Sequence, residues 1–239
     1  MIAALIPAYG AAATVGGVVR GSLPHVDEVL VVDDGSADGS GAAARAAGAL
    51  VVRHRTNRGK GAALATGFGR LLARGASMIV TLDADGQHDP ADIPAFVKAR
   101  RERAADLVVG ARVDAWEAMS GARRFGNRFS CAAVRFFRGP ALPDTQCGFR
   151  LYTRELLESV SFRRRSYDAE VEILMRAGLD GFRVVPLPIR VLAADGRATS
   201  HYRPWLDTYR MCRTVVVACL SSSHRGAHAQ ADRDRVDLA

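Results

Sequence analysis

The strongest constraint on the fold is an alternation of short apolar runs with longer amphipathic segments. Five apolar runs fit strands, and the segments between them fit helices. The strands are expected at residues 2–6, 28–32, 50–52, 78–82 and 107–109, and the helices at 12–20, 39–47, 61–73 and 91–103. Strands that alternate with helices form a mainly parallel open sheet with helices on both faces. The predicted fold class is therefore α/β.

Beyond residue 110 the pattern predicts a different arrangement. We expect a long helix over residues 119–137, a short strand near 148–152, a helix near 168–177, a strand pair around 183–191 and a final helix over 204–220. The helix over 91–103 has a marked start, because Asp89 can cap it and Pro90 fits its first turn. A chain of 239 residues, 49% of them hydrophobic, predicts one domain over residues 1–220 and a polar tail over 221–239.

Composition narrows the class of protein further. The longest apolar run near the C-terminus, residues 215–220, is far shorter than the roughly 20 residues of a membrane-spanning helix. Met1 leads directly into apolar residues without the basic segment of a secretory signal, so the predicted location is the cytoplasm. No Cys-x-x-Cys pair occurs, which predicts reduced and buried cysteines. These are Cys131, Cys147, Cys212 and Cys219.

The chain is basic. It has 33 Lys and Arg against 25 Asp and Glu, a net charge of +8, and only two lysines, Lys60 and Lys98. This excess favours an anionic partner, which means a nucleotide, a lipid phosphate, a membrane surface or a nucleic acid. Nucleic acid is the weakest of these, since the arginines are scattered and no recognition motif accompanies them.

Polar residues follow three of the predicted strands at the point where each strand ends. The first strand ends in Pro7-Ala8-Tyr9, the second in Asp33-Asp34-Gly35-Ser36 and the fourth in Asp83-Ala84-Asp85-Gly86-Gln87. Each string alone is common in turns and helix caps. Ligands of open parallel sheets bind outside the carboxyl ends of the strands, however, so three such strings together predict a ligand site.

The chemistry of these strings fits a nucleoside diphosphate. Two carboxylates two residues apart, in a loop loosened by Gly86, offer hard oxygen ligands to Mg²⁺ or Mn²⁺, which in turn hold diphosphate oxygens. Tyr9 can stack on a base, and Asp33 or Asp34 can accept from a base or a ribose hydroxyl. The sequence contains neither GxxxxGK[ST] nor GxGxxG, which argues against a P-loop nucleotidase and a dinucleotide-dependent oxidoreductase.

Several strings carry a family resemblance. Residues 6–9 and 31–36, the run Asn57-Arg58-Gly59-Lys60-Gly61 and the acidic string at 83–87 resemble the inverting family 2 glycosyltransferases of the GT-A fold. Val109-Gly110-Ala111-Arg112 and Asp144-Thr145-Gln146-Cys147-Gly148-Phe149-Arg150 look more narrowly like the polyprenyl-phosphate hexosyltransferases, the dolichyl-phosphate mannose and glucose synthases. The resemblance extends from about residue 2 to residue 205.

The resemblance implies roles for individual residues. The base and ribose of the nucleotide would contact Pro7, Ala8, Tyr9, Val32 and Asp34. The diphosphate and its metal would contact Asp83, Ala84, Asp85 and Gln87, with Asp85 and Gln87 as the metal ligands. Arg112 would approach the sugar or a phosphate, and Arg203 would belong to a basic loop that closes over the donor. The implied donor is of the UDP-glucose or GDP-mannose type, and the implied acceptor is a polyprenyl phosphate.

The chain departs from the family pattern at two places. Family members usually follow Pro-x-Tyr with Asn-Glu, whereas this chain has Gly10-Ala11, and residues 200–205 differ from the Gly-Glu-Ser-Lys of the eukaryotic synthases. A lipid phosphate acceptor is already anionic at neutral pH, so a general base is optional. A hydroxyl acceptor would need one, for which Asp144 is the first candidate. For Asp168 and Glu170 we favour a structural ion pair.

The helix predicted over 119–137 bears on membrane contact. Its arginines and its phenylalanines fall on neighbouring stripes, a pattern typical of a basic amphipathic helix that lies on an anionic bilayer. The arginines are Arg124, Arg128 and Arg135, and the apolar stripe is Phe125, Phe129, Ala132 and Phe136. The alternative is a helix that packs inward and has a solvated basic edge.

The function predicted is metal-dependent, inverting transfer of a hexose to a polyprenyl phosphate by a cytoplasmic protein in peripheral contact with the inner membrane face. Transfer to a hydroxyl of a glycan or lipid and nucleotidyl transfer are the enzymatic alternatives. An alternative of another class is a non-catalytic protein that binds nucleotide sugars or a membrane surface.

Overall fold

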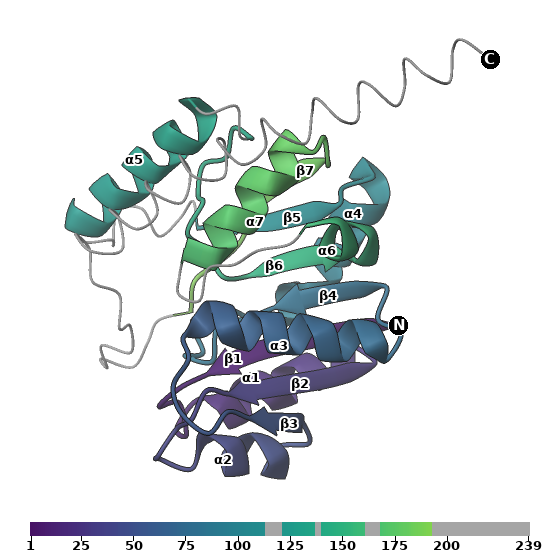
Figure 1. Ribbon diagram of the computed structural model, residues 1–239, viewed down its shortest axis with the longest axis vertical. Helices are drawn as coiled ribbons and strands as arrows, with labels where there is room; N and C mark the ends of the chain where they lie inside the picture. Colours follow the sequence, from purple (N-terminus) through teal and green to yellow (C-terminus); the bar gives the residue numbers. More distant parts are fainter. Residues whose placement is uncertain (113–120, 137–139, 161–167, 193–239) are drawn as a thin grey trace.

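The computed structural model describes residues 1–112, 121–136, 140–160 and 168–192. Its centre is a seven-stranded sheet of order β3-β2-β1-β4-β6-β5-β7 (Figure 1). The strands are β1 (Ile2–Ala8), β2 (Glu28–Asp33), β3 (Leu50–Arg53), β4 (Met78–Thr81), β5 (Leu107–Ala111), β6 (Arg150–Thr153) and β7 (Val184–Pro188). Neighbours are parallel except β6, which is antiparallel to both β4 and β5. The predicted α/β class is confirmed.

Helices cover both faces of this sheet (Figure 1). On one face lie α3 (Lys60–Ala73) and α7 (Asp168–Leu179), and on the other lie α1 (Val15–Ser22), α2 (Ser40–Ala46) and α4 (Ile93–Arg103). Successive strand residues point to opposite faces, so Leu5 packs in the core beneath α3 while Ile6 packs in the core beneath α1. Both are fully buried, which explains the uninterrupted apolar character of β1.

The order of the strands creates a switch point beside β1. The chain builds β1, β2 and β3 outward in one direction and then returns through α3 to place β4 on the other side of β1. The three strands β2, β1 and β4 are parallel, with Ala8 opposite Asp33 and Leu5 opposite Thr81. Their carboxyl ends therefore meet at one edge of the sheet, where open α/β sheets bind ligands.

Most predicted elements are confirmed with shifts of a few residues at their ends. The helix predicted from residue 91 is divided into a 3-10 turn, η2 (Pro90–Asp92), and α4. The side chain of Asp89 accepts a hydrogen bond of 3.0 Å from the Ala91 N–H, so Asp89 is the predicted cap. The helix predicted over 119–137 is α5 (Gly121–Phe136), while the final helix predicted over 204–220 and the tail over 221–239 lie outside the described residues.

One prediction about local structure was wrong, and one helix was missed. The strand pair predicted around 183–191 is a single strand, β7, followed by an isolated bridge between Val191 and His88. Pro186 and Pro188 lack the N–H groups that a second ladder needs, which suits β7 to the edge of the sheet. The short helix α6 (Arg154–Ser159) was not predicted, although the side chain of Thr153 caps it by accepting from the Leu156 N–H.

Two further expectations bear on membranes and thiols. Among the helices of the described segments, none combines the length and the apolar character that crossing a bilayer requires. Cys147 is a buried free thiol, as predicted. The free thiol Cys131, on α5, was also expected to be buried but is only partly buried. Cys212 and Cys219 lie outside the described residues.

The tight packing of α3 against β1 generates a testable prediction. A methyl group at Gly67 would overlap the buried Leu5 side chain, whereas a methyl group at Gly69, on the exposed side of the same helix, would meet nothing within 4 Å. We expect Gly67→Ala to lower the free energy of unfolding by about 1–3 kcal/mol through overpacking. The matched control, Gly69→Ala, should raise it by about 0.5–1 kcal/mol. Urea unfolding of both variants measures the contrast, and equal effects would contradict this packing.

Candidate active site

Three loops that follow β1, β2 and β4 are joined by hydrogen bonds at the carboxyl edge of the sheet. The hydroxyl of Thr14, after β1, donates to the carbonyl of Ala84, after β4, at 2.6 Å. The backbone N–H of Gly10 donates to Ser36 Oγ at 3.2 Å, and the N–H of Ala11 donates to Ser40 Oγ at 2.8 Å. The three polar strings predicted from the sequence therefore lie together.

The carboxylate of Asp83 is held by a partly buried ion-pair network. Lys60, the first residue of α3, places Nζ 2.6 Å from Asp83 Oδ1 and 3.1 Å from Glu170 Oε2 on α7. Burial opposes ionisation of Asp83, but the Lys60 ammonium outweighs it and lowers the pKa of Asp83 to about 2. Burial likewise disfavours the charged form of Lys60, yet Asp83 and Glu170 raise its pKa. Asp83 and Lys60 are both charged at neutral pH.

Asp85 lies in a different electrostatic environment, although it is only two residues away. It is partly buried, and its Oδ1 accepts a hydrogen bond of 3.0 Å from the Gln87 N–H within the same loop. Burial, and then the negative charge of Asp83, raise the pKa of Asp85. A cation that approached this pair of carboxylates would relieve both effects, since it would compensate a negative charge that the protein only partly solvates.

The two aspartates at the end of β2 point into the protein. Asp34 is 2% exposed, and its carboxylate accepts from the backbone N–H groups of Arg58 and Gly59 at 3.0 and 2.7 Å. His54 Nδ1 lies 2.6 Å from Asp34 Oδ1. Asp33 accepts from the N–H of Ser36 at 2.9 Å. Both carboxylates therefore organise the loops, and a direct contact of Asp34 with a nucleotide stays a prediction.

Arg112, directly after β5, and Asp144 form a bidentate pair near the loop of residues 83–87, which we call the acidic loop. Arg112 Nε and Nη2 donate to the two carboxylate oxygens at 2.6 and 3.1 Å, and the Gln146 N–H donates to Asp144 Oδ1 at 2.9 Å. The Asp144 side chain is fully buried, while that of Arg112 is 21% exposed. Burial opposes ionisation of Asp144, but Arg112 outweighs it and holds the pKa of Asp144 below its usual value. A carboxylate in this position is a poor general base.

The remaining predicted residues differ in accessibility. Tyr9 is 47% exposed at the edge of the sheet, whereas Val32 is fully buried within β2. Ala8 and Ala84 are buried, and Pro7 and Gln87 are partly buried. Arg203 lies outside the described residues. The structure thus brings the predicted loops to one edge of the sheet, with Tyr9 exposed and Val32 within the core.

Three residues that the sequence analysis did not assign also organise this edge: Lys60 is partly buried, and Arg150 and His88 are buried. Lys60 was quoted only as part of a motif, and the one signal that could have singled it out is its rarity, since the chain has 31 arginines and two lysines. Arg150 is fully buried and donates to the carbonyls of Thr145, Cys147 and Glu170, each at 2.7 or 2.8 Å. His88 is 4% exposed, and burial lowers its pKa. Charged residues in apolar surroundings carry no periodic sequence signal.

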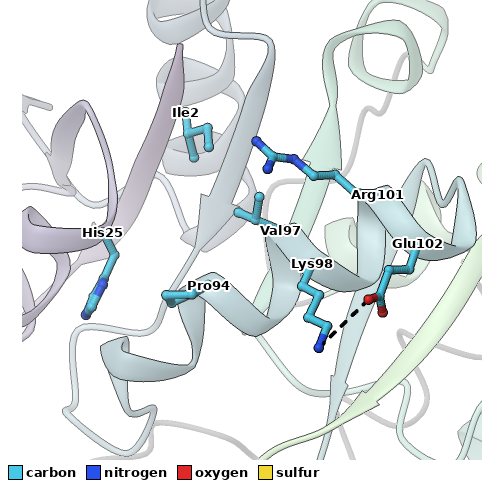
Figure 2. Close-up of a pocket in the computed structure, with 7 residues that line it drawn as sticks. All are labelled: Ile2, His25, Pro94, Val97, Lys98, Arg101 and Glu102. Atoms are coloured by element: carbon cyan, nitrogen blue, oxygen red, sulfur yellow. Dashed lines mark ion pairs between the residues drawn. The ribbon is translucent and has the colours of Figure 1, made fainter.

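A hollow of about 410 Å³ lies elsewhere on the molecule. Its lining includes Ile2, the first residue of β1, and His25 and Pro94 (Figure 2). The charged side chains beside it include Lys98 and Glu102, which form an ion pair of 3.8 Å. Because Ile2 marks the amino end of β1, this hollow is at the opposite edge of the sheet from the acidic loop, and none of the predicted site residues lines it.

The residues at the carboxyl edge fit a divalent cation. Asp83, Asp85 and Gln87 offer the oxygen donors that Mg²⁺ and Mn²⁺ prefer, and the raised pKa of Asp85 indicates an incompletely compensated charge. Within the described segments, no group of three His, Cys, Asp or Glu side chains is spaced to enclose a metal ion. A cation here would therefore take further ligands from a bound substrate and from water, which is the usual mode of Mg²⁺ at phosphates.

Comparisons with known proteins agree with this geometry. The crystal structure of glucosyl-3-phosphoglycerate synthase from Mycobacterium tuberculosis, in complex with Mn²⁺, uridine diphosphate and glucosyl-3-phosphoglycerate, is similar with a TM-score of 0.68. It is 27% identical, and the match covers 93% of this chain and 79% of that chain. Polyprenol monophosphomannose synthase of Mycolicibacterium smegmatis is 35% identical over 188 residues, 72% of this chain and 69% of that protein.

A further relative is undecaprenyl-phosphate mannosyltransferase of Micrococcus luteus, which is 35% identical over 184 residues, 72% of this chain and 74% of that protein. Fold and site together define a glycosyltransferase of the GT-A fold, as the sequence motifs predicted. The chain belongs to Glycosyl transferase family 2, whose sequence model matches residues 3–161.

The Arg112–Asp144 pair predicts a pH-dependent contribution to stability. We expect Asp144→Asn to lower the free energy of unfolding at pH 7 by about 2–4 kcal/mol, because the replacement leaves a largely buried guanidinium without its counter-charge. A carboxyl whose pKa is lowered by folding stabilises the folded state above its unfolded pKa, roughly 3.9, and loses that contribution as the pH falls.

The difference in the free energy of unfolding between the parent and Asp144→Asn should therefore be largest at pH 7 and shrink below about pH 4. Urea unfolding at several pH values measures it. A difference that stays constant down to pH 3 would show that Asp144 contributes through its shape and not through its charge.

Proposed function

We propose that this protein is an inverting, metal-dependent glycosyltransferase that moves a hexose from a nucleoside diphosphate sugar to a polyprenyl phosphate at the cytoplasmic face of the membrane. The names of two relatives at 35% identity, a polyprenol monophosphomannose synthase and an undecaprenyl-phosphate mannosyltransferase, support this acceptor. The Mn²⁺ and uridine diphosphate in the similar crystal structure support this kind of donor and the metal.

The observation that carries the proposal is the convergence of the loops after β1, β2 and β4 at the switch point. Tyr9 is exposed there for stacking on a base, and the acidic loop lies beside it through the bond from Thr14 to Ala84. Lys60 holds Asp83 in one orientation, so the loop is organised before any ligand arrives. When the side chains of a site are already ordered, less of the binding free energy is lost to ordering them.

The metal site that we propose consists of Asp85 and Gln87, with Asp83 beside them. When bound, Mg²⁺ or Mn²⁺ supplies charge stabilisation to the departing diphosphate. The chain's own contribution is to keep Asp83 ionised, through Lys60, and to fix the loop geometry through the hydrogen bond from the Gln87 N–H to Asp85. Arg203, which lies outside the described residues, remains the predicted closing cation.

The environment of Asp144 favours a phosphate acceptor over a hydroxyl acceptor. A hydroxyl must lose a proton as it attacks, and Asp144, the candidate base, is fully buried in a bidentate pair that lowers its pKa. A lipid phosphate, with a second pKa near 6, is anionic at neutral pH and needs no base. Arg112 then acts as a cation for a phosphate: its Nη1 stands outside the pair with Asp144, and its side chain is partly exposed.

The reaction is a single displacement. An oxygen of the acceptor phosphate attacks the anomeric carbon while the bond from that carbon to the β-phosphate oxygen breaks. The electron pair of that bond leaves with the nucleoside diphosphate, and one displacement of this kind inverts the anomeric carbon. The residues of the chain orient the two anionic partners and balance their charge, which is the main contribution of preorganised sites.

The described part of α5 supports contact with a membrane surface. Its inward face consists of Asn127, Ser130 and Val134, which are at most 2% exposed. Phe129 and Phe136, by contrast, are 47% and 80% exposed, beside the arginine stripe. An outward aromatic face next to basic residues fits the headgroup region of an anionic bilayer.

The first functional prediction concerns Asp85. We expect Asp85→Ala to reduce turnover by about 100-fold to 1000-fold, because it removes a ligand of the proposed cation, while the thermal midpoint stays close to that of the parent. Glu102→Gln, a carboxylate on the far edge of the sheet that is 61% exposed, is the matched control and should leave turnover unchanged. The assay measures release of nucleoside diphosphate from UDP-glucose and GDP-mannose with Mn²⁺, with and without undecaprenyl phosphate.

The outcomes of this assay separate the alternatives. Acceptor-dependent release with undecaprenyl phosphate supports the proposal, and unchanged turnover of Asp85→Ala removes Asp85 from the mechanism. Stimulation by 3-phosphoglycerate in place of the lipid would favour a hydroxyl acceptor, and release of pyrophosphate would favour nucleotidyl transfer. Absence of turnover with both UDP-glucose and GDP-mannose would favour the alternative of a non-catalytic binding protein.

The second functional prediction concerns α5. The double change Arg124→Glu with Arg128→Glu should reduce partitioning onto vesicles of anionic phospholipid by roughly tenfold or more, since each basic residue at such a surface contributes about 1 kcal/mol. The matched control is Lys98→Glu with Arg101→Glu on α4, which makes the same change in net charge away from α5. Equal partitioning of the two double variants in a vesicle sedimentation assay would reject α5 as the contact face.

A further inference from the structure

His88 follows directly after the acidic loop and is almost completely buried, at 4% exposed. Its Nδ1 accepts a hydrogen bond of 3.2 Å from the backbone N–H of Asp83, at the start of the same loop. An imidazole that accepts at Nδ1 is neutral and carries its hydrogen on Nε2. That Nε2 lies 3.7 Å from the thiol of Cys147, in the loop that also carries Asp144. One ring therefore connects the two loops that flank the site.

Aromatic packing keeps this ring in place. The His88 ring lies 5.3 Å from the ring of Phe149, which in turn stacks on Phe96 of α4 at 4.2 Å. All three rings are buried, and close packing in a protein interior restricts the rotamers that a side chain can adopt. The position of Nδ1, and with it the position of the Asp83 N–H, is fixed by the core.

The backbone around His88 is anchored as well. His88 forms an isolated antiparallel bridge with Val191, and the N–H of Leu192 donates to the carbonyl of Gln87 at 2.9 Å. The acidic loop is thus held at its start by the side chain of His88 and at its end by the chain that follows β7. Asp85 and Gln87 lie between these two anchors.

A second contact between the two loops shows how closely they fit. A Cβ at Gly148 would lie 2.5 Å from Asp83 Oδ2, so only glycine allows the carboxylate to rest on this backbone. The hydroxyl of Thr81 donates to the carbonyl of Gly148 at 2.8 Å. The acidic loop therefore contacts the Asp144–Gly148 loop at both of its ends. Asp83, its first residue, packs against Gly148, and His88, which follows its last residue, contacts Cys147.

We propose that His88 is a positioning residue that holds the Asp83–Gln87 loop in register with the Asp144–Gly148 loop, and thereby sets the place of Asp85 relative to Arg112. This inference rests on the proposed function, because it assumes that the acidic loop binds a nucleoside diphosphate together with a cation. His88 does not reach that ligand itself. It acts through the Asp83 backbone and through Cys147.

The test compares three replacements of His88 that keep different parts of the ring. His88→Phe keeps the aromatic packing and removes both nitrogens. His88→Asn keeps an acceptor near the place of Nδ1, and His88→Gln places its amide near Nε2 instead. Calorimetric titration with UDP and with GDP, each with Mn²⁺, should give about tenfold weaker binding for Phe and Gln, and an affinity within about threefold of the parent for Asn.

Leu71→Ala is the control for a loss of stability. Leu71 is fully buried in the second half of α3, and its truncation should lower the thermal midpoint without changing the affinity for UDP or GDP. The Asn and Gln variants have the same chemical group, so a comparison between them remains informative even where Phe does not fold.

The outcomes distinguish this inference from the proposed function. A parent protein that binds neither UDP nor GDP with Mn²⁺ contradicts the donor site itself. A parent that binds one of them, with His88→Gln and His88→Asn equally affected, overturns the positioning role and leaves the donor site intact. Weaker binding by Gln with recovery by Asn supports the bond from the Asp83 N–H to His88 as the contact that matters.

Discussion

The parallel pairing of β1 with both β2 and β4 is the constraint on which the site depends. Each pair aligns the carboxyl ends of its strands, so the residues after all three strands emerge at one edge. The chain has to cross the sheet through α3 to achieve this order, and that crossing also brings Lys60, at the first turn of α3, to the same edge. The connection through α3 therefore determines both the order of the strands and the position of the Lys60 charge.

Partly buried ion pairs then give the edge its fixed geometry. Lys60 between Asp83 and Glu170, and Arg112 against Asp144, remove charges from water at a cost that their mutual attraction offsets only with close contacts. In proteins generally, replacing a buried ion pair with well-packed apolar residues is often neutral or stabilising. What the ion pairs add is defined orientation. Asp83 is kept ionised beside Asp85, whose own pKa is raised by burial and by the charge of Asp83, so the loop carries negative charge that the protein compensates only in part.

Much of this architecture could be predicted from the sequence, because local signals specify it. The apolar runs of β1, β2 and β4 and the polar strings that follow them are contiguous, and their joint placement follows from the rule for parallel sheets. The prediction of a strand pair around 183–191 was wrong because it followed apolar character, whereas Pro186 and Pro188 suit this segment to a single strand at the edge of the described sheet. The connection of Lys60 to Glu170 joins residues 110 positions apart and has no local signal at all.

The buried face of α5 illustrates the same division. Periodicity showed an aromatic stripe beside a basic one and left open which face packs inward. The structure buries Asn127, Ser130 and Val134 and leaves Phe129 and Phe136 exposed. The inward face of a helix depends on the shape and the hydrogen-bonding groups of the neighbouring segments as well as on hydrophobicity. Thr145, which donates from its backbone to Asn127 and from its hydroxyl to Ser130, is such a neighbour.

By itself, the sequence determined the α/β class, the three polar strand ends and the family, since each depends on short contiguous patterns. Only the tertiary structure decided which carboxylates are already held by donors and charges of the protein itself. Asp34 and Asp144 match family motifs as well as Asp85 does, yet their oxygens are satisfied by His54, Arg58, Gly59, Gln146 and Arg112. The state of a carboxylate is set by the donors and charges within a few ångströms of it, and those come from distant parts of the chain.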